Sequence, residues 1–239
     1  MKITRPIIAL DFNDRQVALD FLEKFPADEK LFVKIGMELY YSEGQELVKE
    51  VKALGHDVFL DLKCHDIPHT VERAMFVLGS LGVSLTTTHA SGGSEMLKAA
   101  KHGLTEGALQ AGQAEPKLLA ITQLTSTDEA MVKKEQLSAV SLQESVANYA
   151  KLAYASGLDG VVCSGHEAKQ VEALTTPEFL RVTPGIRLAN DSVGDQKRVM
   201  TPDKAAKNGS SAIVVGRSIT QAKDPVVAYA TVKELWREN

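Results

Sequence analysis

Two acidic residues and a lysine lie close together directly after an apolar run. Asp61, Lys63 and Asp66 follow residues 58–60, Val-Phe-Leu, which is typical of a strand leaving the interior. Side chains alternate between the two faces of a strand, so Asp61 and Lys63 are expected to point the same way, with Asp66 in the turn beyond. Pro68 prevents the strand from continuing as a central one. An acid and an ammonium that share one space could carry out proton transfer; a solvated ion pair at a strand end is the alternative.

A further lysine interrupts another apolar run. Lys34 lies within residues 31–35, Leu-Phe-Val-Lys-Ile, and is costly to bury without an acidic partner. Asp11 and Asp61 belong to the strands expected on either side of it. The sequence therefore predicts an alternating array of Lys34, Asp61, Lys63 and Asp66, in which opposite charges keep all four groups ionised. The alternative is a lysine that extends past the strand end into solvent.

The C-terminal third of the chain indicates an anion site. Gly216 and Arg217 follow the apolar run 212–215 and precede a short helical pattern, and Arg187 follows the preceding strand. In barrels built from alternating strands and helices, the loops after the seventh and eighth strands often hold a phosphate. Glycine lets the backbone approach the anion, and an arginine offers two parallel hydrogen bonds. A turn with exposed arginines is the alternative.

The elements that must position these residues alternate eight times between strand and helix. The expected strands are 7–11, 31–35, 58–63, 84–89, 117–123, 160–164, 181–183 and 212–215. The expected helices are 15–25, 42–54, 71–81, 94–109, 142–156, 166–174, 202–208 and 225–238. This alternation implies parallel strands with helical crossovers. Eight repeats predict an α/β fold, a closed (β/α)₈ TIM barrel, with residues 1–239 forming a single catalytic domain.

Local signals refine this pattern. Asn13 and Asp14, Ser94 and Ser141 are candidates for helix N-caps, and glycines are expected where several helices end. The polar segment 125–139 is predicted to be a long connection after the fifth strand. It is either a solvated loop or a mobile lid near the site.

Composition and charge limit the classes of function. The 239 residues carry a net charge of −4, which argues against general nucleic-acid binding. Cys64 and Cys163 lack metal-type spacing and are expected to be packed thiols in a reducing compartment. His65 and His69 are four apart, but Pro68 between them disfavours a metal-binding helix, so no metal site is expected. The apolar stretch near the N-terminus is too short for a signal peptide, and no later run is long enough to span a membrane.

Taken in order along the whole chain, these motifs resemble the orotidine 5′-phosphate decarboxylase family, in its bacterial single-chain form. The residues that carry the resemblance are 9–11, 33–36, 59–70, 124–126, 183–187, 195–196 and 215–218. The resemblance implies decarboxylation of orotidine 5′-monophosphate to uridine 5′-monophosphate, with protonation of C6, as the last step of de novo pyrimidine biosynthesis. It also implies a cytoplasmic carboxy-lyase with no cofactor and no metal, and with neither nucleic acid nor membrane as a partner.

The resemblance assigns roles to individual residues. Lys63 would deliver a proton to C6 of the pyrimidine, Asp61 would lie close to the leaving carboxylate, and Lys34 would hold the array and the ribose. Asp66, with Ile67 and Thr70, would act in the other subunit's site, which implies a homodimer with shared active sites. Segments 125–139 and 190–195 would be candidates for closure over the substrate. The other positions that match substrate-binding residues are Asp11, Leu62, Cys64, His65, Pro68, His69, Thr125, Ser126, Pro184, Arg187, Gln196, Gly216 and Arg217.

Two other functions are weighed against this one. A keto-sugar phosphate decarboxylase or hexulose-phosphate synthase resembles the chain in the Asp-x-Lys-x-x-Asp motif, but those relatives use Mg²⁺ and carry an acidic residue at the position of Lys34. A lysine there puts a cation where a metal ligand is needed. A barrel that binds a nucleotide phosphate without catalysis is the second alternative. An intact charged array argues against it, because buried charges are costly to keep for binding alone.

Overall fold

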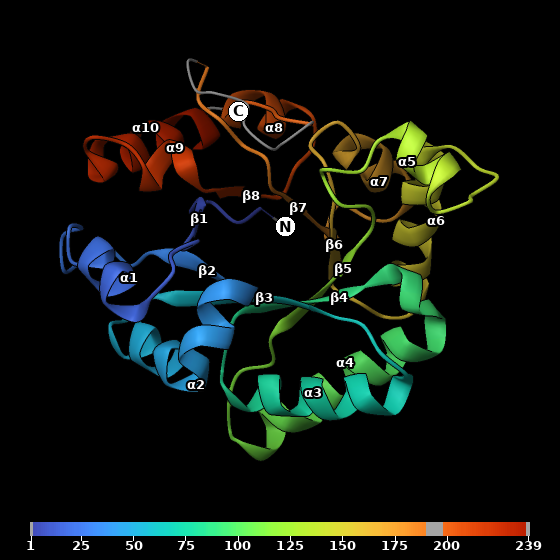
Figure 1. Ribbon diagram of the computed structural model, residues 1–239, viewed down its shortest axis with the longest axis horizontal. Coiled ribbons are helices and arrows are strands. Elements are labelled where there is room, and N and C mark those ends of the chain that lie inside the picture. Colours follow the sequence, from blue (N-terminus) through green and yellow to red (C-terminus); the bar gives the residue numbers. More distant parts are fainter. Residues whose placement is uncertain (1, 190–197, 238–239) are drawn as a thin grey trace.

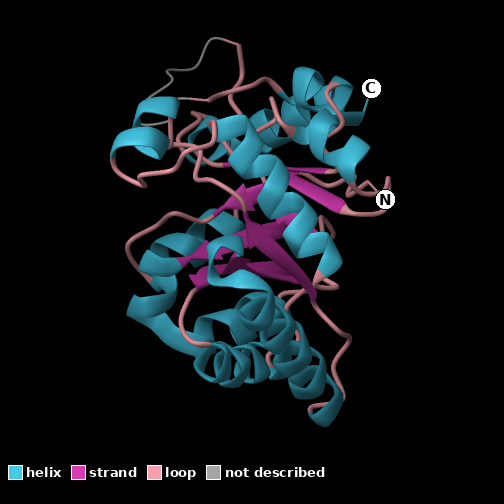
Figure 2. Cartoon of the chain, turned by 90° about the vertical axis from the view of Figure 1, so that its right-hand side faces the viewer, coloured by secondary structure: helices cyan, strands magenta, loops and turns pink. Residues whose placement is uncertain are grey.

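The fold is a closed barrel of parallel strands surrounded by helices. The structure is a computed structural model that describes residues 2–189 and 198–237. Its strands follow one another around the barrel in chain order, from β1 to β8, and β8 pairs with β1. Figure 1 shows the helices as a ring outside the strands, and Figure 2 shows the strands from the side between helical layers. The predicted (β/α)₈ architecture is confirmed.

Each predicted strand is present, with small changes at its ends. The strands are β1 (Ile7–Ala9), β2 (Phe32–Gly36), β3 (Asp57–Cys64), β4 (Leu85–His89), β5 (Lys117–Ile121), β6 (Gly160–Val162), β7 (Leu180–Thr183) and β8 (Ala212–Val215). The helices are α1 (Arg15–Leu22), α2 (Met37–Ala53), α3 (Pro68–Ser80), α4 (Gly93–Gln110), α5 (Glu129–Lys134), α6 (Leu142–Ala155), α7 (Ala168–Leu174), α8 (Pro202–Lys207), α9 (Arg217–Thr220) and α10 (Pro225–Arg237), with a 3₁₀ turn η1 (Ala90–Gly92) before α4.

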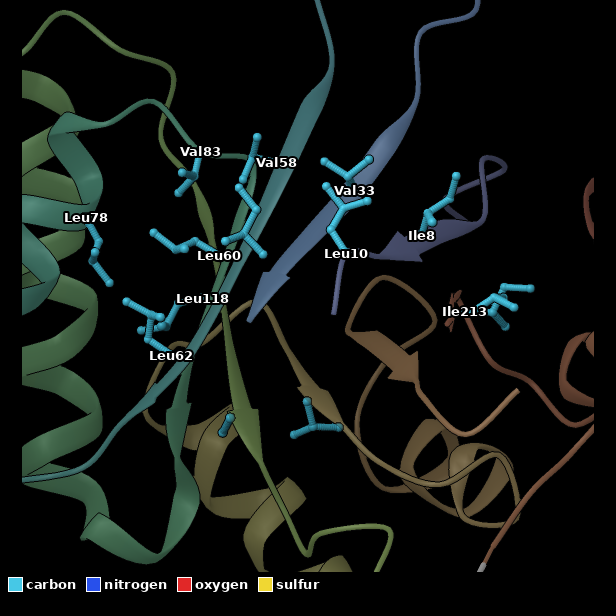
Figure 3. Close-up of a cluster of buried hydrophobic side chains, with 14 of the residues drawn as sticks. Ile8, Leu10, Val33, Val58, Leu60, Leu62, Leu78, Val83, Leu118 and Ile213 are labelled. Carbon is cyan, nitrogen blue, oxygen red and sulfur yellow. The ribbon is translucent and has the colours of Figure 1, made fainter. Parts of the chain in front are cut away.

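The strand alternation divides the apolar residues into two cores. One set faces the barrel interior and includes Ile7, Phe32 and Phe59, all buried. The neighbouring residues face outward and pack against the helices, as Ile8 and Val33 do in the larger cluster drawn in Figure 3. Because side chains alternate, a residue two positions beyond an inward-facing one also faces the interior. By this rule, residues near the carboxyl ends of the strands that follow the barrel core also face the interior, where the site lies.

Three details of the predicted helices are wrong. Segment 125–139 contains α5, which begins where the Asp128 side chain accepts a hydrogen bond from the backbone N–H of Met131 at 2.9 Å. The helix expected from residue 42 already begins at Met37 and is interrupted at Gly44, whose φ is 68°. The helix expected from residue 71 begins at Pro68, because proline suits a first helical turn that needs no N–H donor.

Two of the predicted helix N-caps are confirmed. Asp14 and Ser141 cap their helices, and Ser141 forms a reciprocal capping box with Glu144. Ser94 is not an N-cap, since α4 begins one residue earlier, at Gly93. Within the described part of the chain, every helix is too short or too polar to cross a bilayer.

Candidate active site

Strand alternation brings three charged side chains to the mouth of the barrel. Lys34 lies two residues beyond the inward-facing Phe32, and Asp61 two residues beyond Phe59. In the paired strands β1 and β2, Ala9 is level with Lys34, and Asp11 follows Ala9 on the same face. The apolar interior therefore ends in a layer of charge at the carboxyl ends of the strands, where barrels of this kind carry their chemistry.

The charged side chains form a continuous chain of opposite charges. Lys34 Nζ lies 2.9 Å from Asp11 Oδ1 and 4.0 Å from Asp61 Oδ2. Lys63 Nζ lies 2.8 Å from the same Asp61 oxygen, Oδ2. The Lys34 side chain is 13% exposed and that of Asp61 12%, so the inner pairs are poorly screened by solvent. Asp11, 64% exposed, closes the chain on the solvent side.

Thr87, on the next strand, fixes the central carboxylate and was not predicted. Its buried hydroxyl donates to Asp61 Oδ1 at 2.8 Å and accepts a hydrogen bond from the backbone N–H of Lys63 at 2.9 Å. Lys63 has a φ of 53°, and the pairing of β3 with β4 shifts register between Leu60 and Cys64. A left-handed, non-glycine residue at such an irregularity is uncommon, and bulges of this kind re-aim side chains next to active sites.

A cavity of about 480 Å³ opens above the charged array. Nine of the predicted positions line it: Asp11, Lys34, Asp61, Lys63, Thr125, Pro184, Arg187, Gly216 and Arg217. The other lining residues are Ala9, Phe59, Ile121, Gln123, Leu124, Val162, Cys163, Gly185, Val214 and Gln221. Most of this second set could have been predicted by continuing, on each strand, the series of every second residue that faces the interior as far as the strand's carboxyl end. The cavity is large enough for a nucleotide-sized ligand.

The wall that carries the arginines is formed by β7, β8 and their following loops. Arg187 is buried, and its Nη1 donates to the carbonyl of Ile186 at 2.8 Å. Its backbone N–H donates to the carbonyl of Met200 at 3.0 Å, which ties two segments of the loop after β7 together. Gly216 and Arg217 lie where β8 turns into α9. Gln196 and segment 190–195 lie outside the described residues.

Several predicted residues do not line this cavity. Residues 65–70, which include His65, Asp66, Ile67, Pro68, His69 and Thr70, are exposed, as is Ser126. The Asp66 carboxylate accepts a hydrogen bond from the neighbouring N–H of Ile67 at 2.7 Å. The array predicted within one chain is therefore present without Asp66, and Asp11 takes the fourth place. Leu62 points outward into the core under α3 and α4, near Leu118 in Figure 3, and Cys64 is half-buried beside that core.

Burial shifts the titration of three groups near the cavity. It raises the pKa of the Cys163 thiol above its ordinary range, so this thiol stays protonated. It lowers the pKa of His89, an effect that neighbouring His65 and Lys63 reinforce, so the imidazole is neutral near pH 7. It also raises the pKa of Glu167, against the opposing effect of the Arg198 guanidinium. Over residues 2–189 and 198–237, no cluster of three or more His, Cys, Asp or Glu side chains could hold a metal ion.

Comparison with known proteins decides the family. Residues 4–232 match the model of the orotidine 5′-phosphate decarboxylase / HUMPS family. The chain belongs to this family. An orotidine 5′-phosphate decarboxylase from Ligilactobacillus salivarius is 65% identical over 238 residues, covering 100% of both chains. One from Lactococcus lactis subsp. cremoris is 56% identical over 238 residues, again with 100% of both chains covered.

Solved structures agree with the family assignment. The crystal structure of orotidine 5′-phosphate decarboxylase from Lactobacillus acidophilus superposes with a TM-score of 0.87 at 43% identity. The match covers 98% of this chain and 99% of that one. An uncharacterized conserved protein from Geobacillus kaustophilus gives a TM-score of 0.86 at 46% identity, over 97% of this chain and 99% of that one. The resemblance to the orotidine 5′-phosphate decarboxylase family predicted from the motifs is confirmed.

Proposed function

We propose that the protein decarboxylates orotidine 5′-monophosphate to uridine 5′-monophosphate without a cofactor. The observation that carries this proposal is the Lys63 ammonium, held 2.8 Å from Asp61 at the floor of a nucleotide-sized cavity. Loss of CO₂ leaves an electron pair at C6 of the pyrimidine. A fixed ammonium beside C6 stabilises that charge more in the transition state than in the ground state, which lowers the barrier. Lys63 then donates a proton to C6, which completes the product.

The other charged groups have supporting roles in this proposal. Asp61, held by Thr87 and by two lysines, orients Lys63 and lies beside the leaving carboxylate. Lys34 neutralises Asp61 and, with Asp11, binds the ribose hydroxyls. Thr125 contacts the pyrimidine from the wall after β5. Arg187, Gly216 and Arg217 bind the 5′-phosphate on the wall formed by the loops after β7 and β8, where arginine can hold a dianion with paired hydrogen bonds.

The position of Lys34 favours this reaction over the metal-dependent reactions considered from the sequence. Its ammonium lies 2.9 Å from Asp11 and 4.0 Å from Asp61, the carboxylates that a divalent cation would need. A positive charge already balances those oxygens, so adding Mg²⁺ there would be opposed by like-charge repulsion. The charged array thus supports catalysis that needs no added metal.

The proposed function predicts turnover that is independent of metal. The decrease in absorbance of orotidine 5′-monophosphate should proceed at the same rate with and without EDTA. A requirement for Mg²⁺ would favour a keto-sugar phosphate type of reaction instead. Tight binding of uridine 5′-monophosphate with no turnover of the substrate would favour the non-catalytic barrel.

We also propose that the active unit is a homodimer of single-domain chains in the cytoplasm. The segment 65–70 is exposed beside the mouth, and Ile67 within it is 66% exposed, so an apolar side chain is available there for contact with a second chain. Asp66 would then complete the charged array of the neighbouring subunit's site, as the family resemblance implies. Two free thiols, Cys64 and Cys163, fit a reducing compartment.

Shared sites predict complementation between inactive subunits. Lys63→Ala and Asp66→Ala chains should each have little activity alone, because each lacks one charge at every site. When the two are mixed and allowed to exchange subunits, one site of each heterodimer is intact, and about a quarter of wild-type activity should return. Lys63→Ala mixed with Lys34→Ala is the control, since both positions act in their own chain, each site of that heterodimer lacks one lysine, and no activity should return. If the Lys63→Ala and Asp66→Ala mixture exchanges subunits but stays as inactive as this control, Asp66 acts within its own chain.

A further inference from the structure

Arg198 connects three segments around the cavity. Its Nη2 donates to the backbone carbonyl of Leu124 at 2.8 Å, and its Nη1 pairs with the carboxylate of Glu167. The other oxygen of that carboxylate accepts a hydrogen bond from the backbone N–H of Ser164 at 2.9 Å. One guanidinium thus joins the loop after β5 to the loop after β6, from a position on the loop after β7.

The anchor of this connection is a buried charge. Glu167 is 7% exposed, and burial raises the pKa of its carboxyl group, whereas the Arg198 guanidinium opposes that shift. A carboxylate in such surroundings is costly without a partner, so the pair holds Arg198 firmly in place. Glu167 immediately precedes α7, and its carboxylate is held by the backbone N–H of Ser164, two residues after β6. The anchor is therefore rigid relative to the barrel.

Arg198 lies on the loop after β7, which also carries Arg187 of the cavity wall. Two residues further along, Met200 is paired with that wall through backbone hydrogen bonds, its carbonyl accepting from Arg187 at 3.0 Å and its N–H donating to Gly185 at 3.2 Å. On the other side, Leu124 and the following Thr125 both line the cavity. Arg198 itself is not among the described residues that form the cavity wall. It acts between the two walls and does not contact the ligand space.

We propose that Arg198 is a positioning residue that links the phosphate-binding wall to the pyrimidine-binding wall, with Glu167 as its anchor. This inference rests on the proposed function and adds a residue to it. Phosphate binding is remote from the reacting carbon, and its energy helps catalysis only if the two walls are held in one arrangement. The single hydrogen bond to the Leu124 carbonyl sets the pyrimidine-side loop relative to the arginine-bearing loop.

The geometry requires arginine at this position. The guanidinium directs separate N–H groups to the carboxylate and to the carbonyl at the same time, with a fixed angle between them. A lysine has a single ammonium group in place of the planar guanidinium. That ammonium would pair with the buried carboxylate of Glu167, because leaving the carboxylate unpaired costs more than losing the hydrogen bond to the Leu124 carbonyl. Arg198→Lys is therefore expected to keep the ion pair and lose the link to Leu124.

The test compares a substrate that has the phosphate with one that lacks it. For Arg198→Lys, kcat/KM for orotidine 5′-monophosphate should fall about tenfold, whereas kcat/KM for orotidine should change less than about twofold. Inhibition by ribose 5-phosphate should stay near the wild-type value, because Arg198 does not touch the phosphate. Equal losses for both substrates would indicate a general structural defect and would overturn the proposal, as would a selective loss of ribose 5-phosphate binding.

Two further variants complete the experiment. Glu167→Gln removes the charge of the anchor and should lower the ratio of kcat/KM for orotidine 5′-monophosphate to kcat/KM for orotidine, as Arg198→Lys should. This variant tests the proposal if Arg198→Lys does not fold. Arg181→Lys is the matched control, because Arg181 pairs with Glu172 and donates to the Gly209 carbonyl at 2.7 Å in a buried network outside the cavity wall. It should lower the melting temperature and leave the ratio unchanged. Wild-type protein that binds uridine 5′-monophosphate but does not turn over would refute the proposed function alone; the link would then be tested by the affinity ratio of uridine 5′-monophosphate to uridine.

Discussion

Replacing Lys63 with alanine should abolish decarboxylation and leave nucleotide binding largely intact. The ammonium is the cation that lies 2.8 Å from Asp61 at the cavity floor, and in the proposed mechanism it both stabilises the carbanion and supplies the proton. Removing one fixed donor from a developing anion typically costs on the order of 10²–10³ in rate, and here the proton source is lost as well. We therefore expect kcat to fall by at least about 10³-fold.

The measurement separates chemistry from binding. Turnover is followed by the absorbance of orotidine 5′-monophosphate, and binding by titration with uridine 5′-monophosphate, which has no carboxylate to oppose Asp61. The matched control is Lys49→Ala, which removes an exposed lysine paired with Glu46 at 2.7 Å on α2 and should change neither quantity. A Lys63→Ala variant with near wild-type kcat would refute the role assigned to this residue.

The charged site was largely predictable because its geometry follows from strand alternation. Lys34 and Asp61 lie two residues beyond inward-facing aromatics, so the period of two that fills the barrel also aims these charges into its mouth. The order of the strands around the barrel follows from the chain order, which places Asp11 and Asp61 on either side of Lys34. In this case local pattern and global topology agree, and no long-range information is needed beyond the number of strands.

Other parts of the site depend on contacts that no local pattern encodes. Thr87 lies within a strand of three consecutive threonines, and only the register of β4 against β3 makes its hydroxyl the one that meets Asp61. The positive φ of Lys63 arises at the same irregular pairing. Arg198 is found only when its partners, separated from it by more than thirty positions in the sequence, are brought together by the barrel. The proposed role of Asp66 in a neighbouring subunit's site comes from the family resemblance, because no pattern within the sequence of one chain indicates it.

Replacing Arg217 with alanine should weaken binding of the phosphorylated ligand selectively. Arg217 lines the cavity where β8 turns into α9, on the wall where the proposal puts the 5′-phosphate. A hydrogen bond between charged groups contributes about 1.5–3 kcal/mol, so affinity for uridine 5′-monophosphate should fall about 10- to 100-fold. Affinity for uridine, which has no phosphate, should change less than about twofold.

Measuring uridine and uridine 5′-monophosphate together separates phosphate binding from a change in the shape of the pocket. Arg15→Ala is the control, because Arg15 forms an ion pair with Glu50 at 2.8 Å between α1 and α2 and lies outside the cavity wall. It should leave both affinities unchanged. Equal losses of uridine and uridine 5′-monophosphate in Arg217→Ala would mean that the arginine supports the shape of the pocket and does not bind the phosphate. If Arg217→Ala loses affinity only for uridine 5′-monophosphate, its KM for orotidine 5′-monophosphate should also rise far more than its KM for orotidine. Only the phosphorylated substrate carries the dianion that this wall is proposed to hold.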